Sequence, residues 1–419
     1  MLSPPAWKGQ KMQNTKTWKR LFFTLYIGQA FSLLSSNAVQ FAIIWWITVE
    51  TGSAIALTFA SIIGLLPQVL IGPFAGVWID RLNRKFILVT ADIAVAASSL
   101  ILGLSFFFGT PSLWFVYAVL CVRALGETFH KPALQAAIPQ LVPKSDLTRA
   151  GGMGQAVSSI TTMTGPILGA FLMSITALPY VMLVDVVGAA LAVFTLSFVR
   201  IPKYTATQTH RPNIIKDIRQ GIGVIRANNL LMWMSIPVFI TSIVFLPLGT
   251  LLPLMVREYF QGGAWHNGIV QTLFSLGMLI TAMVIGLTGG LKKPTLMISF
   301  SSLLLGACAL IGGLLPASAF WIFCIVVFLM GTTGMLGNIP FMAYIQQSVP
   351  QENLGKVISF VTSVMSLGIP IGLSISGPVA EIIGVNQWMR IAGILMLCVG
   401  LLSLWIPRAE HPEVLVRVS

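Results

Sequence analysis

Charged residues are scarce in this sequence. They make up 9% of its 419 residues, whereas soluble domains contain roughly 25%. Negatively charged residues are scarcer than positively charged ones, with 12 Asp and Glu against 25 Lys and Arg. A soluble globular domain is therefore excluded, and the basic excess has to be explained by something other than a nucleic-acid surface.

Cysteine and histidine are also rare, with four of each. The cysteines lie in apolar stretches at no metal-ligand spacing, so we expect them to be packing residues: Cys121, Cys308, Cys324 and Cys398. The histidines are scattered along the chain, which argues against a histidine-built metal site or a catalytic triad: His130, His210, His266 and His411. No Gly-x4-Gly-Lys-Ser/Thr sequence occurs, so energy from bound ATP is not indicated. We expect no metal, no cofactor and no enzymatic activity.

Apolar residues dominate instead. They form 56% of the chain, and the mean hydropathy is +0.88. A hydrocarbon core about 30 Å thick requires roughly 20 apolar residues per helix. Twelve segments meet this requirement: 21–48, 54–78, 86–108, 112–132, 148–174, 179–199, 229–256, 267–290, 295–315, 318–344, 355–380 and 387–406. The sequence predicts an all-α integral membrane protein with twelve transmembrane helices.

The positions of the basic residues predict the orientation. Cytoplasmic loops are enriched in Lys and Arg. All but three of the 25 basic residues lie before, after or between these spans on one side of the membrane; the exceptions are Arg123, Arg257 and Arg390. Both termini are then cytoplasmic, and the net charge of +13 faces anionic lipid headgroups rather than nucleic acid. We expect a multi-pass protein of a bacterial cell membrane that acts as a monomer.

A long polar segment divides the spans six and six. The predicted organisation is an N-terminal six-helix bundle (1–199), a central cytoplasmic loop (200–228) and a C-terminal six-helix bundle (229–419). The halves also resemble each other: "AAIPQLVPKSDLTR" at 136–149 and "AYIQQSVPQENLGK" at 343–356 occupy equivalent places. Two parallel six-helix repeats with a substrate site near the midplane are typical of major facilitator transporters.

The segment between spans two and three strengthens this resemblance. "GVWIDRLNRK" at 76–85 matches the signature loop of the major facilitator superfamily through five residues: Gly76, Asp80, Arg81, Arg84 and Lys85. The resemblance implies a conformational latch in which Asp80 organises the neighbouring cations. The alternative is an ordinary basic cytoplasmic loop. The second half retains only "GGLKKP" at 289–294.

The fifth span carries "TGPILGA" at 164–170, which resembles the motif of exporting members of the superfamily in Gly165, Pro166 and Gly169. Ala170 departs from the usual second glycine. Pro166 removes a backbone donor, and the glycines permit close helix approach. The motif favours antiport, although a purely structural kink is the alternative.

Several further stretches resemble, in shared order, the macrolide-efflux transporters of the drug–proton antiporter group: 28–44, 51–54, 129–134, 200–203, 364–373 and 384–388. The resemblance implies an exporter of hydrophobic small molecules that is driven by protons. A membrane enzyme or lipid-handling protein would need clustered His or carboxylates at one membrane face. Export of an endogenous metabolite, such as a siderophore or lysolipid, remains open.

Two charged residues stand one helical turn apart in the fourth span. Arg123 and Glu127 are about 6 Å apart along the helix, so their side chains can meet. Ions inside a membrane cost about 2.5–3.5 kcal/mol and are functional candidates by default. We predict a proton-coupling ion pair; a structural salt bridge is the alternative.

Two other carboxylates compete for the proton. Asp185 lies in the sixth span and Asp92 in the third, and either could be a solvated end residue or a partner of Arg123. Four polar residues share one face of the first span and are candidates for lining the substrate cavity or for bonding a neighbouring helix: Gln29, Ser32, Ser36 and Gln40.

Overall fold

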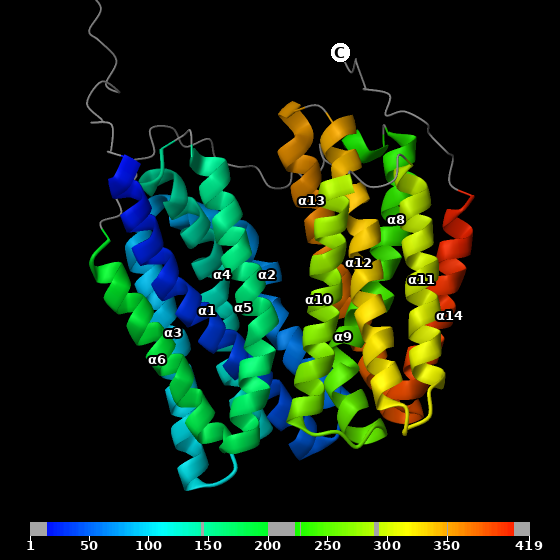
Figure 1. Cartoon of the computed structure of the whole chain (residues 1–419), viewed down its shortest axis with the longest axis horizontal. Helices are drawn as coiled ribbons and strands as arrows, with labels where there is room; N and C mark the ends of the chain where they lie inside the picture. The colour runs from blue at the N-terminus through cyan, green and yellow to red at the C-terminus, as the bar shows by residue number, and fades with distance from the viewer. Residues whose placement is uncertain are drawn as a thin grey trace, which may run out of the picture. The chain divides into compact units, whose positions relative to one another are not determined.

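The computed structural model describes residues 15–143, 146–199, 223–226, 228–288, 293–349 and 351–405, and no strand occurs in them. Figure 1 shows long helices that run roughly parallel to one another within each half of the chain. The first half contributes α1 (Thr15–Thr51), α2 (Ala54–Arg81), α3 (Arg84–Ser105), η2 (Phe106–Phe108), α4 (Leu113–Leu141), α5 (Leu147–Ile175) and α6 (Leu178–Ser197). The second half contributes α8 (Asn229–Val244), α9 (Leu246–Leu254), η4 (Met255–Tyr259), α10 (Ala264–Thr288), α11 (Pro294–Leu314), α12 (Phe320–Ser348), α13 (Gln351–Ile383) and α14 (Val385–Ser403).

Eleven of the twelve predicted spans each coincide with one helix, and the seventh coincides with the consecutive segments α8, α9 and η4. The predicted fold class is therefore confirmed. Eleven helical segments of the described chain are long and apolar enough to cross a membrane. The twelfth helix is α4, whose apolar run is interrupted by Arg123, Glu127 and His130. The helix whose apolar run is interrupted by these three ionisable residues is thus the one that carries the candidate site.

The seventh span is not one continuous α-helix. Phe245 ends α8, Pro247 stands at the beginning of α9, and a π-helical turn follows from Met255 to Tyr259. Pro247 and Pro253 lack the backbone N–H that a regular helix requires, which explains an interruption in this region. Segmentation of this kind is common in transporters.

Several helices extend beyond the predicted spans. The fourth span was predicted to end at residue 132, but α4 continues to Leu141 with Pro132 and Pro139 inside it. The second span was predicted to end at residue 78, but α2 continues through Arg81. Hydropathy detects the part of a helix that matches the hydrocarbon, whereas the helix itself continues into the polar region.

Contacts divide the chain into two compact units. The first contains residues 1–40, 66–165 and 176–208; the second contains 41–65, 166–175 and 209–419. This grouping differs from the predicted bundles because one end of α1, of α2 and of α5 belongs to the second unit. The predicted division at 199 and 229 follows the sequence repeat and stays a prediction.

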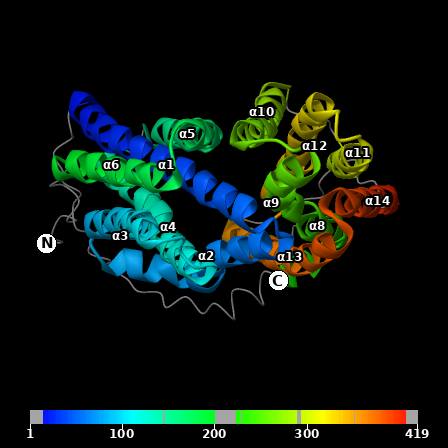
Figure 2. The same ribbon diagram turned by 90° about the horizontal axis from the view of Figure 1, so that it is seen from below.

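In the first unit α3 packs against both α4 and α6, and Figure 2 shows these helices beside one another. A buried cluster fills one end of the unit, where Trp18 and Phe22 of α1 meet Leu88 of α3 and Leu134 of α4. This apolar packing holds α3 and α4 together at that end of the unit. Polar side chains farther along both helices are thereby held opposite each other.

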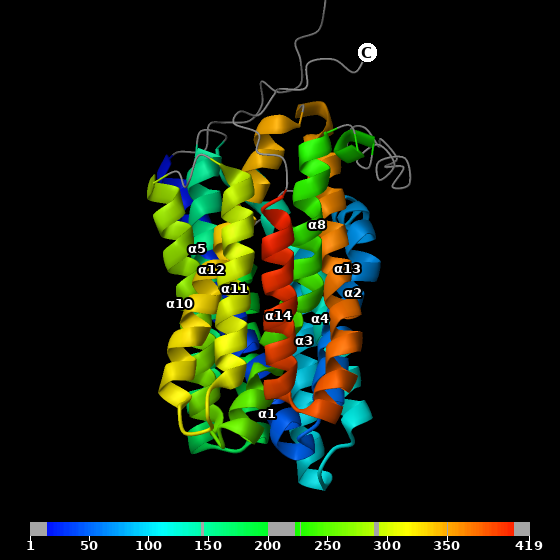
Figure 3. The same ribbon diagram turned by 90° about the vertical axis from the view of Figure 1, so that its right-hand side faces the viewer.

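In the second unit α11 packs between α12 and α14, as Figure 3 shows for α11 and α14. The close approach depends on small residues. A Cβ atom on Gly306 would lie 2.7 Å from the Leu397 nitrogen, and one on Gly400 would lie 2.6 Å from the Leu303 side chain. Small residues let transmembrane backbones approach and gain van der Waals contact, which replaces the hydrophobic driving force available in water.

Glu381 of α13 binds the N-terminus of α2 within the same unit. Its Oε2 accepts hydrogen bonds from the Ser53 hydroxyl at 3.1 Å and from the backbone N–H groups of Ala54 and Ile55 at 2.5 and 3.2 Å. The first N–H groups of a helix have no partner inside the helix, and a carboxylate satisfies both them and the helix dipole. Glu381 is therefore a helix cap provided by another helix.

Candidate functional site

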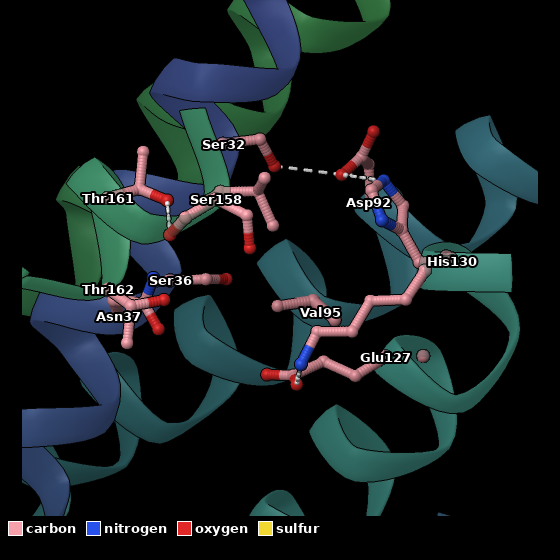
Figure 4. A pocket seen from close by; sticks show the side chains of 14 residues that line it. Ser32, Ser36, Asn37, Asp92, Val95, Glu127, His130, Ser158, Thr161 and Thr162 are labelled. Carbon is pink, nitrogen blue, oxygen red and sulfur yellow. Dashed lines mark hydrogen bonds and ion pairs between the residues drawn. The ribbon is translucent and has the colours of Figure 1, made fainter. Parts of the chain in front are cut away.

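Asp92 of α3 lies inside the first unit and is 5% exposed. Its Oδ1 accepts a hydrogen bond from the Ser32 hydroxyl at 2.8 Å, and its Oδ2 accepts one from the Gln29 amide at 3.2 Å. His130 of α4 approaches from the other side, with Nε2 3.4 Å from Oδ1. Figure 4 shows Ser32 and His130 on opposite sides of the carboxylate.

A pocket opens beside this carboxylate, entirely within the first unit. Helices α1, α3, α4 and α5 line it, and most of the lining side chains are polar: Ser32, Leu33, Ser36, Asn37, Ala91, Asp92, Val95, Gly126, Glu127, His130, Lys131, Ser158, Thr161 and Thr162. A concave site with several convergent polar groups is the usual form of a small-molecule site. Its hydroxyl groups can bind water, a proton donor or a polar substrate group.

A second carboxylate, Asp185 of α6, is fully enclosed. Asp185 and Arg123 are each 2% exposed, and Arg123 Nη1 forms an ion pair with Asp185 Oδ2. The hydroxyl of Ser99 donates to the same oxygen at 2.7 Å, and that of Ser36 donates to Oδ1 at 2.9 Å. Arg123 Nη2 also donates to the Ser36 carbonyl at 3.1 Å. This network joins α1, α3, α4 and α6.

The predicted pairing of Arg123 with Glu127 was therefore wrong. Glu127 forms an ion pair with Lys131 at 3.0 Å, and the two side chains are 46% and 62% exposed. The i,i+4 spacing permits both pairings, but only the second lets Glu127 remain hydrated. A buried guanidinium requires a carboxylate at its own depth, and Asp185 provides it.

The other predicted candidates on α1 divide into three groups. Gln29 and Ser32 bind Asp92, Ser36 binds Asp185, and both serines also line the pocket. Gln40 does not line the pocket. The polar face of α1 thus bonds neighbouring helices and lines a cavity at the same time, so both alternatives predicted for it apply.

The predicted latch residues lie where α2 ends and α3 begins. Gly76, Asp80 and Arg81 belong to the last turns of α2, and the side chains of Asp80 and Arg81 lie outside the described part of the structure. Arg84 Nη1 donates to the Ala136 carbonyl at 2.6 Å, and Lys85 Nζ donates to the carbonyls of Ser197 and Val199 at 3.2 and 3.0 Å. Lys85 thus binds carbonyl groups at the C-terminal end of α6, whereas Arg84 binds a carbonyl group inside α4. A latch role for Asp80 stays a prediction.

The predicted antiporter motif lies within α5, where Pro166 is an interior residue and Gly165 and Gly169 are buried. Gly165 packs directly on α1: a Cβ atom there would overlap the Asn37 side chain and lie 3.2 Å from the Asn37 carbonyl carbon. The glycine is required for close approach at a point beside the pocket. Its connection with antiport stays a prediction.

His130 was not predicted as a site residue. A usable signal was present, because Arg123, Glu127 and His130 stand at i, i+4 and i+7 and so share one face of α4. The shared face does not reveal that the three side chains have different partners. His130 faces Asp92, which is 38 positions earlier on another helix.

Membrane-spanning helices that enclose a polar pocket lined by a buried carboxylate, here Asp92, are typical of membrane transporters. The chain belongs to the Major Facilitator Superfamily, whose profile matches residues 25–269 and 248–417.

Relatives and solved structures agree with this assignment. Macrolide efflux protein A of Streptococcus pyogenes is 38% identical over 93% of this chain and 96% of that protein. The protein of the same name from Enterococcus faecalis is 37% identical over 77% of this chain and 100% of that protein. The Staphyloferrin A transporter of Staphylococcus aureus is 23% identical over 91% and 96%. The nucleoside transporter NupG has the same fold, with a TM-score of 0.68 at 14% identity over 92% of this chain and 98% of that one. A bacterial homologue of the human lysosomal transporter Spinster also has this fold, with a TM-score of 0.70 at 13% identity over 93% of this chain and 98% of that one.

Proposed function

We propose that this protein is a secondary active exporter that moves hydrophobic drugs of the macrolide type out of a bacterial cell in exchange for protons. Transport proceeds by alternating access between the two halves, and no ATP or cofactor takes part. The partners are the drug, the proton and the surrounding lipid, and the protein works as a monomer with both termini in the cytoplasm.

One observation carries the proposal, namely the similarity to Macrolide efflux protein A along almost the whole length of both chains. A match confined to apolar spans would support only a shared fold. This match extends over 93% of this chain and 96% of the relative, so it is not confined to one part of the fold. We therefore transfer efflux of macrolides as the proposed activity.

The pocket supports coupling to protons. Two carboxylates and one imidazole line it, Asp92, Glu127 and His130, and each can exchange a proton with water that enters. Ionisable groups in a membrane interior are costly and are retained along ion and substrate pathways. A transporter that used only a drug gradient would not need them.

A second substrate class has one specific point in its favour. The Staphyloferrin A transporter is related over nearly the full chain, although at lower identity, and the pocket lining is largely polar. Export of an endogenous polar metabolite such as a siderophore is accordingly the alternative.

Accumulation assays test the function. We expect drug-sensitive bacteria that express the protein to accumulate several-fold less labelled macrolide than cells with an empty vector, because export opposes entry. An uncoupler should abolish the difference within minutes, since it removes the proton gradient. Labelled staphyloferrin A is the matched second substrate. Equal macrolide accumulation with and without the protein, at verified membrane expression, would contradict drug export, and reduced siderophore accumulation would favour the alternative.

A further inference from the structure

The two buried carboxylates of the first unit differ in the chemistry of their hydrogen-bond partners. Asp185 faces Arg123, and a guanidinium has only donors and no acceptor. A proton on Oδ2 would place a donor against these N–H groups. A proton on Oδ1, which faces the Ser36 hydroxyl, would leave the buried guanidinium without its counter-charge. The surroundings of Asp185 therefore suit the carboxylate form alone.

Every partner of Asp92 can serve either protonation state. The Ser32 hydroxyl donates to Oδ1 and can rotate to accept instead. The Gln29 amide donates through Nε2 to Oδ2, while its buried Oε1 has no hydrogen-bond partner among the described residues. Half a turn of the amide would present Oε1 to a protonated carboxyl group. Gln29 can thus also provide a hydrogen-bond acceptor to a protonated Asp92.

Access to water also separates the two carboxylates. Asp92 and His130 line the pocket, whereas Asp185 and Arg123 do not. The other charged groups that line it are Glu127 and Lys131, both from α4; α1 and α5 contribute only hydroxyl, amide and apolar groups. Glu127 is half exposed and paired with Lys131. Its carboxylate is therefore in contact with solvent rather than with the enclosed interior.

We propose that Asp92 holds the exchangeable proton of the transport cycle, with His130 as its proton-sharing neighbour and Gln29 as a positioning residue, while the Asp185–Arg123 pair stays ionised throughout. The proton passes from water in the pocket to an Asp92 carboxylate oxygen and returns to water when the carboxylate re-forms. The inference rests on the proposed proton-coupled function and names the group that performs the coupling.

Infrared difference spectra of the purified full-length protein test the proton site without any drug. Acidification should produce the carbonyl absorption of a buried, protonated carboxyl group in the wild type and in Glu127→Gln. The absorption should be missing in Asp92→Asn, which keeps the size of the side chain but cannot ionise. A wild-type spectrum from Asp92→Asn would overturn the proposal.

Proteoliposomes then connect this proton with transport. We expect drug-induced proton movement to be lost in Asp92→Asn and retained in Glu50→Gln, because Glu50 is exposed near the end of α1 and does not line the pocket. Both variants should still bind labelled macrolide. Asp92→Ser, which is smaller, serves as a second variant: loss of proton movement in both, with binding retained, assigns the effect to the titratable group. Wild-type proton movement in either Asp92 variant would overturn the proposal. The wild-type protein could also show the infrared absorption of Asp92 but no drug-driven proton movement. That result would contradict the proposed function while still supporting Asp92 as the group that binds the proton.

Gln29→Leu distinguishes positioning from a structural role. The substitution removes a donor to the charged form of Asp92, and hydrogen bonds to ionised groups are stronger than those to neutral ones. The neutral form is therefore favoured, and both the infrared absorption and the transport activity should shift to higher pH. An unchanged pH profile with altered thermal stability would show that Gln29 only packs.

Discussion

Arg123 binds across the helix bundle to α6 rather than along its own helix, and burial is the reason. Its side chain and that of Asp185 are equally enclosed, whereas Glu127 one turn away is hydrated and bound to Lys131. Three hydroxyl and carbonyl groups from Ser36 and Ser99 complete the network. A buried pair of this kind stabilises the fold only as long as both partners are present.

We expect Asp185→Asn to destabilise the protein by about 3–5 kcal/mol, because it leaves a buried guanidinium without its counter-charge. The double variant Arg123→Gln with Asp185→Asn should recover most of this loss, since no unpaired charge remains. Thermal unfolding of the purified variants measures both effects. Glu127→Gln is the matched control and should change stability by less than about 1 kcal/mol, because an exposed pair contributes little. A double variant as unstable as Asp185→Asn alone would contradict a mutually neutralising pair.

The sequence could identify these charged residues but not their partners. Spacing within one helix reports only neighbours on that helix, so it favoured Glu127 for Arg123 and left Asp185 and Asp92 as open alternatives. The true partner stands 62 positions away. Long-range pairs such as Asp92 with His130 depend on how α3 is packed against α4, and nothing in the local pattern determines that packing.

At the scale of whole elements, the positions of the helices could be predicted and their ends could not. Hydropathy located all twelve spans because the hydrocarbon thickness fixes an apolar length. It missed the final turns of α4 and α2 because helices continue into the polar region without an apolar signal. The break between α8 and α9 was also missed, although Pro247 and Pro253 mark the region where it occurs.

The cap on α2 leads to a prediction about that helix. Removal of the carboxylate in Glu381→Ala leaves the N–H groups of Ala54 and Ile55 without their acceptor, and loss of a helix cap costs about 0.5–2 kcal/mol. We expect faster hydrogen–deuterium exchange at residues 54–57 and a lower unfolding temperature. Glu50→Ala is the matched control, because Glu50 is exposed in the last turn of α1. Its charge opposes the helix dipole there, so its removal should leave the protein equally or slightly more stable. Unchanged exchange at 54–57 in Glu381→Ala would contradict the cap.

At the scale of the whole molecule, composition and the order of motifs were sufficient to predict a twelve-helix transporter of the major facilitator type. They were not sufficient for the contact pattern. Residues 41–65 and 166–175 pack with the second unit although they belong to helices of the first half of the sequence. Contacts between distant helices follow from surface shape, such as the fit of Gly377 of α13 against Thr58 of α2. A single sequence carries no direct record of this fit.

The orientation in the membrane is a property of the whole chain, and it provides the last prediction. The basic residues are concentrated in the N-terminal tail, in the central segment 200–226 and in other loops on the same side, and such loops remain in the cytoplasm. Reporter fusions after Ser419 and within residues 203–215 should therefore both report a cytoplasmic location. A fusion at Gly109, in the turn between η2 and α4, is the matched control and should report the outside, because one more span separates it from the cytoplasmic turn between α2 and α3. An external signal from either of the first two fusions, at normal expression, would contradict the predicted topology. External signals from both would reverse it and place the Glu381 cap on the cytoplasmic side.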